Sequence, residues 1–367
     1  MKKNEFFNQQ SNLTTAKIKI FEEYITGYLP KLLLTFETLI IADLFCGAGK
    51  NGKQDGSPLI LINALNHLLK SKYFRNKPNL KTYILFNDQS KENIESLRNE
   101  LSKIKYDDKV ISITIKNENY EEYLNLFINK LKKNKTPKFI FLDPFTYSNV
   151  KINDIKELMN LPHTEVLLFI PIFHSYRFAS TEFEKEHKTR KFIEEFTSRG
   201  VNNYDSIIDF MLSVREQLMN KLSLKFVRPI LLDDGGRKNS LFLLTSHQKG
   251  MLLMNKVIFK NSDDGIRFSV DNLYQDLLFK PDEISNFVDN FKKQLIVELK
   301  KNDLTNEQIV HFTIQEGLLP KHSKKILNNL YLKRKIKVYD EFKNEINNKL
   351  KWNIAEKINT TTIFKWL

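Results

Sequence analysis

The chain has 367 residues, 41% of them hydrophobic, and a formal net charge of +14. This composition supports one large folded domain plus a smaller one and excludes a disordered chain. A single cysteine, Cys46, excludes an internal disulfide and a cysteine-based zinc site. No apolar run reaches the roughly 20 residues of a membrane-spanning helix. The seven histidines show no H-x-x-x-H spacing, so we expect a cytoplasmic protein without a structural metal.

The first two thirds of the chain alternate apolar strands with amphipathic helices. A helical segment is expected from Thr15 to about Leu34, before the first strand. Near-continuous apolar strands between amphipathic helices are typical of a parallel sheet covered on both faces. The expected strands are 37–45, 81–88, 109–117, 137–145 and 165–173, and the expected helices between them are 57–73, 90–104, 120–133 and 152–160. Ser57, with Pro58 after it, and Ser90 are expected as helix N-caps.

The pattern then changes to two helices, 188–196 and 205–222, followed by two apolar runs around "DDGGRKNS". A turn rich in glycine between two apolar runs predicts an antiparallel hairpin. A parallel sheet that ends in such a hairpin is the usual arrangement of class I methyltransferases, whereas a Rossmann dehydrogenase sheet stays parallel. We therefore expect an α/β Rossmann-like sheet domain over residues 39–260, preceded by a helical lead-in over 1–38.

The C-terminal part is strongly basic. From Leu319 to Leu367 there are 12 Lys or Arg against 4 Asp or Glu. A connecting segment with a helix is expected over residues 261–301. Residues 302–367 then have the order helix, turn, helix, strand, which predicts a winged helix. Its first helix is expected to have Thr305 and Gln308 as a capping box and to end at Gly317. A basic winged helix favours nucleic acid as a partner. The candidate nucleic-acid-binding residues are Lys321, Lys324, Lys325, Lys333, Arg334 and Lys335.

The glycine loop "IADLFCGAGKNGKQDGSPL" (40–58) fits three kinds of nucleotide site. A P-loop needs a Ser or Thr after its lysine, but Gln54 follows Lys53. A dinucleotide site needs a helix that opens inside the motif, but the expected helix starts only at Ser57, so Gly52 belongs to a loop. The third alternative, an S-adenosylmethionine (SAM) site, fits best.

SAM carries a sulfonium, an amino group, a ribose diol and an adenine instead of a phosphate. A carboxylate at the end of the first strand suits the amino group, and two glycines let the backbone approach the ligand closely. Asp43 precedes Gly47 and Gly49 in this way, and Asp88 at the end of the next strand is placed for the ribose. We include Phe45, within the same loop, among the cofactor-binding candidates.

The fourth strand ends in the candidate catalytic residues Asp143, Pro144 and Phe145. This turn resembles the (D/N)-P-P-(Y/F) turn of amino-methyltransferases, in which the acidic or amide side chain accepts a hydrogen bond from the target amine and the aromatic ring stacks on the base. Such catalysis depends mostly on positioning, and the base must be single-stranded or flipped. The alternative is a strand-ending Asp-Pro turn with a core Phe. Cytosine C5 methylation is excluded because Cys46, inside the cofactor loop, is the chain's single cysteine.

These motifs together resemble the three-Cys-motif partner family, TcmP. The resemblance runs through "TTAKIKIFEEYITGYL", "DLFCGAGK", "DGSPLILINAL", "FND", "FLDPFTY" and "SLFLLTSHQKGMLLMNKV" into the basic tail, and so covers nearly the whole chain. It implies a methyltransferase-like partner of a three-cysteine, radical-SAM-like protein in mobile or defence loci, with Asp43, Gly47, Gly49 and Asp88 for cofactor. This chain differs from the family pattern in two places. The D-P-F turn is commonly followed by Gly, and here Thr146 follows it. The loop commonly reads A-G-P-G, and here it reads Cys46-Gly47-Ala48-Gly49.

Two hypotheses follow from the sequence. The first is a SAM-dependent methyltransferase that acts on an exocyclic amine of a nucleic-acid base and uses its basic C-terminal domain to position the substrate. The second is a methyltransferase-like scaffold that binds nucleic acid or a three-Cys-motif partner and methylates nothing.

Overall fold

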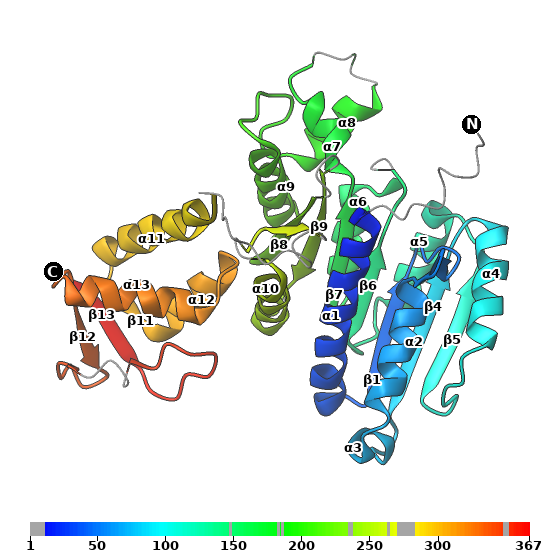
Figure 1. The fold of residues 1–367 in the computed structure, drawn as a ribbon, viewed down its shortest axis with the longest axis horizontal. Helices are drawn as coiled ribbons and strands as arrows, with labels where there is room; N and C mark the ends of the chain where they lie inside the picture. Colours follow the sequence, from blue (N-terminus) through cyan, green and yellow to red (C-terminus); the bar gives the residue numbers. More distant parts are fainter. Residues whose placement is uncertain are drawn as a thin grey trace. The chain divides into compact units, whose positions relative to one another are not determined.

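The computed structural model describes residues 12–146, 149–181, 184, 187–233, 238–262, 265–269, 283–347 and 352–367. The chain divides into two compact units, which Figure 1 draws in the colours of the sequence. The large unit contains Met1–Leu253 and Ile266–Gln275, and the small unit contains Met254–Gly265 and Asp276–Leu367. In the described part of the chain, no helix is both long and apolar enough to cross a membrane.

The described residues of the large unit form an eight-stranded sheet in the order β10-β8-β9-β7-β6-β1-β4-β5. Each of its strands pairs in parallel with its neighbours except β9, which is antiparallel to both β7 and β8. The strands are β1 (Thr38–Asp43), β4 (Lys81–Asn87), β5 (Ile111–Lys116), β6 (Lys138–Leu142), β7 (Thr164–Ile170), β8 (Phe226–Asp233), β9 (Lys238–Thr245) and β10 (Arg267–Ser269).

This topology confirms the predicted parallel strands and the antiparallel hairpin that follows them. The turn of the hairpin, 234–237, lies outside the described residues. When these eight strands are numbered by their order along the chain, their order across the sheet is 3-2-1-4-5-7-6-8. A reversed seventh strand between the fifth and the sixth is the class I methyltransferase arrangement. The eighth strand, β10, lies beyond the expected end of the sheet domain near residue 260; its three residues are too few to give a readable pattern.

Helices cover the sheet on both faces, because right-handed crossovers place helices on one face while the chain adds strands from β1 toward β5, and on the other face once it returns to β6 and adds strands in the opposite direction. Helices α1 and α2 are in contact and lie in front of the sheet in Figure 1. Helices α5, α6 and α9 form a second contacting series. The helices are α1 (Asn12–Thr35), α2 (Ser57–Leu68), α3 (Lys72–Arg75), α4 (Lys91–Ser102), α5 (Tyr120–Leu131), α6 (Ile152–Met159), α7 (Ile172–Arg177), α8 (Lys188–Phe196), α9 (Ile207–Leu222) and α10 (Gln248–Asn261).

A buried hydrogen-bond cluster fixes α1 on the sheet. The Tyr24 hydroxyl donates to the Glu165 carboxylate of β7 across 2.6 Å, and the Thr245 hydroxyl of β9 donates to the same carboxylate across 2.8 Å. Burial raises the pKa of Glu165, so a buried carboxylate at this position depends on both donors. The cluster therefore sets the height and rotation of α1 over the sheet.

The segment between β1 and α2 contains a small hairpin rather than a simple loop. Strands β2 (Lys50–Asn51) and β3 (Gln54–Asp55) pair antiparallel, and Gly52 lies in the turn at φ +61°. Helix α2 begins after this hairpin, at Ser57, as expected. Its N-cap is Gly56 rather than Ser57, which corrects the predicted cap by one residue, because Gly56 is the last extended residue and Ser57 already lies in the helix. The predicted N-cap of α4, Ser90, is confirmed.

The small unit packs helices against a three-stranded antiparallel sheet in the order β11-β13-β12. Its own elements are α11 (Glu283–Lys301), β11 (Leu304–Thr305), α12 (Asn306–Gln315), α13 (Pro320–Leu332), β12 (Ile336–Asp340) and β13 (Thr362–Trp366). The predicted order of helix, turn, helix and strand is confirmed, as is the Thr305–Gln308 capping box. The end of α10 joins this unit, where the Asn255 amide donates to the Ile314 and Leu318 carbonyls, 3.1 Å each.

Candidate functional site

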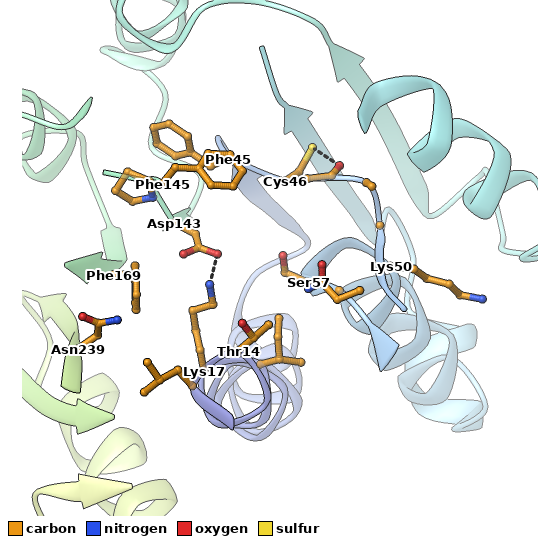
Figure 2. Close-up of a pocket in the computed structure, with 18 residues that line it drawn as sticks. Thr14, Lys17, Phe45, Cys46, Lys50, Ser57, Asp143, Phe145, Phe169 and Asn239 are labelled. Atoms are coloured by element: carbon orange, nitrogen blue, oxygen red, sulfur yellow. Dashed lines mark hydrogen bonds and ion pairs between the residues drawn. The ribbon is translucent and has the colours of Figure 1, made fainter. Parts of the chain in front are cut away.

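A cavity of about 480 Å³ lies at the carboxyl ends of β1 and β6 in the large unit. Open α/β sheets bind ligands at this edge of the strands, where successive loops diverge. Figure 2 shows its side chains arriving from α1, the glycine loop, the turn after β6 and the neighbouring strands. The lining residues are Leu13, Thr14, Lys17, Ile18, Phe45, Cys46, Gly47, Ala48, Gly49, Lys50, Asn51, Gly56, Ser57, Asp143, Pro144, Phe145, Phe169 and Asn239.

The glycine loop forms one wall of the cavity. Gly47 has φ +63°, and a Cβ added there would meet no atom within 4 Å, so its surface is open toward a ligand. Gly49 has φ +82° and faces inward, because a Cβ there would lie 2.9 Å from a Leu97 methyl. The Gly56 N–H donates to the Gly49 carbonyl across 2.8 Å and closes the loop. Lys53, the P-loop candidate, is exposed and does not line the cavity.

Asp43 lies behind this wall, 2% exposed, at the end of β1. Its carboxylate accepts hydrogen bonds from the Ser57 hydroxyl at 2.6 Å and from the Phe45 N–H at 3.3 Å. Burial raises the pKa of Asp43 to about 7, and the nearby Asp143 carboxylate adds to the rise, while the Ser57 hydrogen bond opposes it. A carboxyl with this pKa changes charge near neutral pH.

Asp88 is also buried, 3% exposed, but its carboxylate faces the loop backbone rather than the cavity. It accepts from the Gly47 N–H at 3.0 Å, from the Ser90 N–H at 2.8 Å and from the Asn93 amide at 3.2 Å. The structure thus gives Asp88 a role in holding the glycine loop against the end of β4. Its contact with a ribose stays a prediction.

The turn after β6 forms the opposite wall. Pro144 is buried and Phe145 is 72% exposed, so its ring faces outward beside the cavity instead of joining the core. This exposure removes the core-Phe alternative considered for the sequence. The Asp143 carboxylate pairs with the ammonium of Lys17 at 2.5 Å, as Figure 2 shows with a dashed line.

Lys17 is the site residue that sequence reasoning missed. It comes from α1, its ammonium lies 4.7 Å from the centre of the Phe169 ring, and its side chain is 13% exposed. Tyr24 stands seven residues later, two helical turns along the same face, so the buried cluster at Glu165 also aims Lys17 at the cavity. One feature of the sequence could have pointed to Lys17, namely its position within the "TTAKIKIF" segment that carries part of the family resemblance.

Cys46 lines the cavity but is unsuited to nucleophilic chemistry. Burial raises the pKa of its thiol far above the ordinary value, and the Asp43 and Asp88 carboxylates add to the rise. A thiol in this environment stays protonated and weakly nucleophilic. Cys46 therefore packs in the loop, as the sequence indicated.

The six basic candidates of the small unit lie on α13 and in the turn after it. Lys321 and Lys325 are one helical turn apart on the exposed face of α13, and Lys324 beside them is half-buried. Lys333, Arg334 and Lys335 are exposed between α13 and β12. These residues form one basic stretch of the small unit, while the cofactor and turn candidates belong to the large unit.

No protein-family model and no curated protein matches the chain. Among solved structures, protein LPL1258 from Legionella pneumophila is 14% identical with a TM-score of 0.40, covering 65% of this chain and 86% of its own.

Two further solved structures are similar. Trm1 from Pyrococcus horikoshii in complex with SAM is 10% identical with a TM-score of 0.37, and the match covers 64% of this chain and 57% of Trm1. A structure from Listeria monocytogenes described as a putative class I SAM-dependent methyltransferase is 11% identical with a TM-score of 0.30, and the match covers 62% of this chain and 59% of that chain. All three scores lie below 0.5, so the fold assignment rests on the strand order of the sheet itself.

Proposed function

We propose that the cavity of the large unit binds SAM and that the protein methylates an exocyclic amine of a nucleic-acid base. The observation that carries the proposal is the convergence of the open Gly47 loop and the Asp143–Phe145 turn on one cavity at the carboxyl edge of a class I methyltransferase-type sheet. The cavity volume of about 480 Å³ falls within the range of about 300–1,000 Å³ for small-molecule sites.

The residues present fit SAM in charge as well as in shape. When bound, SAM supplies a methyl group on a positively charged sulfur. The Asp143 carboxylate lines the cavity, the Asp43 carboxyl lies behind the glycine loop, and the open face of Gly47 leaves room for a ligand against the backbone. A cation favours the ionised form of a nearby carboxyl, so SAM and an ionised Asp43 stabilise each other.

The turn after β6 supports an amine as the methyl acceptor. A carboxylate oxygen accepts a hydrogen bond from an amine N–H, which turns the nitrogen lone pair toward the methyl donor. The exposed Phe145 ring offers a stacking surface for the flat base that carries this amine. The base has to be unpaired, because its Watson–Crick edge must enter the cavity.

The small unit supports nucleic acid as the substrate. Its helix–turn–helix order and three-stranded antiparallel sheet fit the predicted winged helix, and the exposed basic residues of α13 and the following turn fit a phosphate-binding surface. We propose that this unit binds the nucleic-acid backbone. The partner with a three-cysteine motif, implied by the family resemblance, remains a second proposed partner of the chain.

One observation favours the scaffold hypothesis instead. The Asp143 carboxylate, which the enzyme hypothesis assigns to the amine, is already paired with Lys17. The two hypotheses are distinguished with labelled SAM and single-stranded DNA and RNA. For the enzyme, Asp143→Ala lowers methyl transfer by at least about a hundredfold while Asp143→Asn, which keeps an acceptor oxygen, retains much of it. If the protein is a scaffold, the wild type transfers no methyl group to DNA or RNA, whether or not it binds SAM.

A further inference from the structure

We infer that Lys17 is a specificity-determining residue that donates a hydrogen bond to the ring nitrogen beside the target amine. This inference rests on the proposed function and adds to it the hydrogen-bond pattern of the substrate edge. The pattern belongs to a heteroaromatic amine, in which the amino group and a ring nitrogen without hydrogen share one carbon.

The inference starts from the hydrogen-bonding capacity left at the Lys17–Asp143 pair. An ammonium has three N–H donors, and the described residues provide Lys17 with one oxygen acceptor, Asp143 Oδ2, and the Phe169 ring. A carboxylate accepts about four hydrogen bonds, and Asp143 Oδ1 accepts none from the described residues. Both groups line the cavity. The pair therefore presents one donor and one acceptor side by side to a ligand.

This donor and acceptor stand next to an exposed aromatic ring. Phe145 follows Asp143 by two residues, lines the same cavity and is 72% exposed, so its ring is accessible to a flat ligand that also reaches the pair. An edge with an N–H next to a bare nitrogen satisfies both groups at once. Adenine, cytosine and guanine each have such an edge, at N6 and N1, at N4 and N3, and at N2 and N3, respectively. An alkyl amine such as a lysine side chain has no acceptor for Lys17.

A charged donor left without its acceptor in a cavity is costly, which makes the discrimination strong. A hydrogen bond from a charged group contributes about 1.5–3 kcal/mol, or roughly 10-fold to 150-fold in a rate or binding constant. The alternative is that the Lys17–Asp143 pair only holds α1 against the turn after β6. In that case a substitution at Lys17 lowers the rate on every substrate by the same factor, and the ratio of the rates with and without the ring nitrogen stays unchanged.

The test uses substrates that differ by one ring atom. Thymidine oligonucleotides with a single central adenine, cytosine or guanine first identify the accepting base with labelled SAM. That base is then replaced by its deaza analogue, 1-deazaadenine, 3-deazacytosine or 3-deazaguanine, which keeps the amine but has C–H in place of the ring nitrogen. Equilibrium binding of each oligonucleotide without SAM is measured by fluorescence anisotropy as a second readout.

We expect the wild type to lose roughly 10-fold to 150-fold in kcat/KM on the deaza substrate, and Lys17→Met to react with both substrates at the same reduced rate. Lys17→Arg restores part of the discrimination. Lys19→Met, on the same helix but outside the cavity lining, behaves as the wild type, and thermal unfolding verifies that each variant is folded.

Equal rates of the wild type on both substrates, or undiminished discrimination by a folded Lys17→Met variant, overturn the inference while the proposed methylation stands. Methylation of a lysine peptide at a rate comparable to that of the best oligonucleotide overturns it as well. A protein that binds no SAM, or that methylates none of the three bases, overturns the proposed function together with the inference.

Discussion

The Ser57 hydroxyl donates a hydrogen bond of 2.6 Å to the Asp43 carboxylate, and this contact joins the start of α2 to the end of β1 directly behind the glycine loop. Ser57 also lines the cavity, so its hydroxyl lies between a ligand there and the Asp43 carboxyl, whose pKa is about 7. The charge of Asp43 near neutral pH is thereby linked to what occupies the cavity.

The affinity for SAM is expected to depend on pH. Below about pH 7 Asp43 is protonated in the free protein, and a cationic ligand favours its ionised form, so binding releases a proton. Affinity therefore rises with pH through about 7 and then levels off. Calorimetry at several pH values, in buffers of different ionisation enthalpy, measures both effects. Asp43→Asn should remove the proton release. A slope that persists unchanged in this variant would assign it to another group.

The stability of the protein without ligand should depend on pH in the opposite sense. Burial raises the folded pKa of Asp43 from 3.8 to about 7, so the folded state holds this proton more tightly than the unfolded chain. The stabilising contribution is complete below about pH 4 and is lost as pH rises to about 7, by up to about 1.4 kcal/mol per pH unit. Urea unfolding of the wild type and Asp43→Asn measures the difference. Parallel stability curves for the two proteins would contradict the assignment.

Gly47 and Gly52 form a matched pair for testing the glycine loop. Both have positive φ, +63° and +61°, and at both an added Cβ meets no atom within 4 Å. Substitution by alanine should therefore destabilise each variant similarly, by about 1–2 kcal/mol, because of the left-handed backbone. Gly47 lines the cavity and Gly52 does not, so Gly47→Ala alone should weaken SAM binding. Equal binding by both variants would show that the loop does not contact the cofactor.

Asp88 should act through the loop. Asp88→Ala leaves the Gly47 N–H without its acceptor, which costs about 1–3 kcal/mol in unfolding free energy and lowers SAM affinity. Asp107 is the control, because it accepts one backbone N–H at an exposed turn, and Asp107→Ala should change stability by no more than about 0.5 kcal/mol. If Asp88→Ala lowered the affinity for SAM without changing the unfolding free energy, Asp88 would contact the ligand directly instead of holding the loop.

Binding of nucleic acid should weaken with salt, since each phosphate contact releases counterions. Lys321→Ala and Lys325→Ala, on the exposed face of α13, should each lower the magnitude of the logarithmic salt slope by about 1. Lys53→Ala, at the exposed turn of the β2–β3 hairpin, is the control and should leave the slope unchanged. An affinity that is independent of salt would argue against a phosphate-binding surface on α13.

Much of the fold was predictable because buried strands and amphipathic helices have strong local patterns. The five central strands and the hairpin of β8 and β9 were expected from their apolar runs. Strand β10 was missed because three residues give no period, and its pairing with β8 is a long-range event. The cap of α2 was misassigned because a Ser at a helix start suggests a cap, whereas here Ser57 is the first helical residue and its hydroxyl donates to Asp43, which no local pattern shows.

The candidate site was predictable in its motifs but less so in its contacts. The position of Asp43 and of the turn at Asp143 was predictable because strand-ending acids meet at one edge of a parallel sheet. The orientation of Asp88 toward the loop was not readable, since a turn residue can point to either side. Lys17 was missed because its partner Asp143 is 126 positions away, and no local pattern encodes such a pair.

The most direct measurement is a calorimetric titration of the purified full-length chain with SAM, repeated with Gly47→Ala and Gly52→Ala. We expect binding at one site per chain that weakens in Gly47→Ala and persists in Gly52→Ala. Absence of binding heat at several temperatures, together with no thermal shift of the folded wild type, would contradict a SAM site in this cavity.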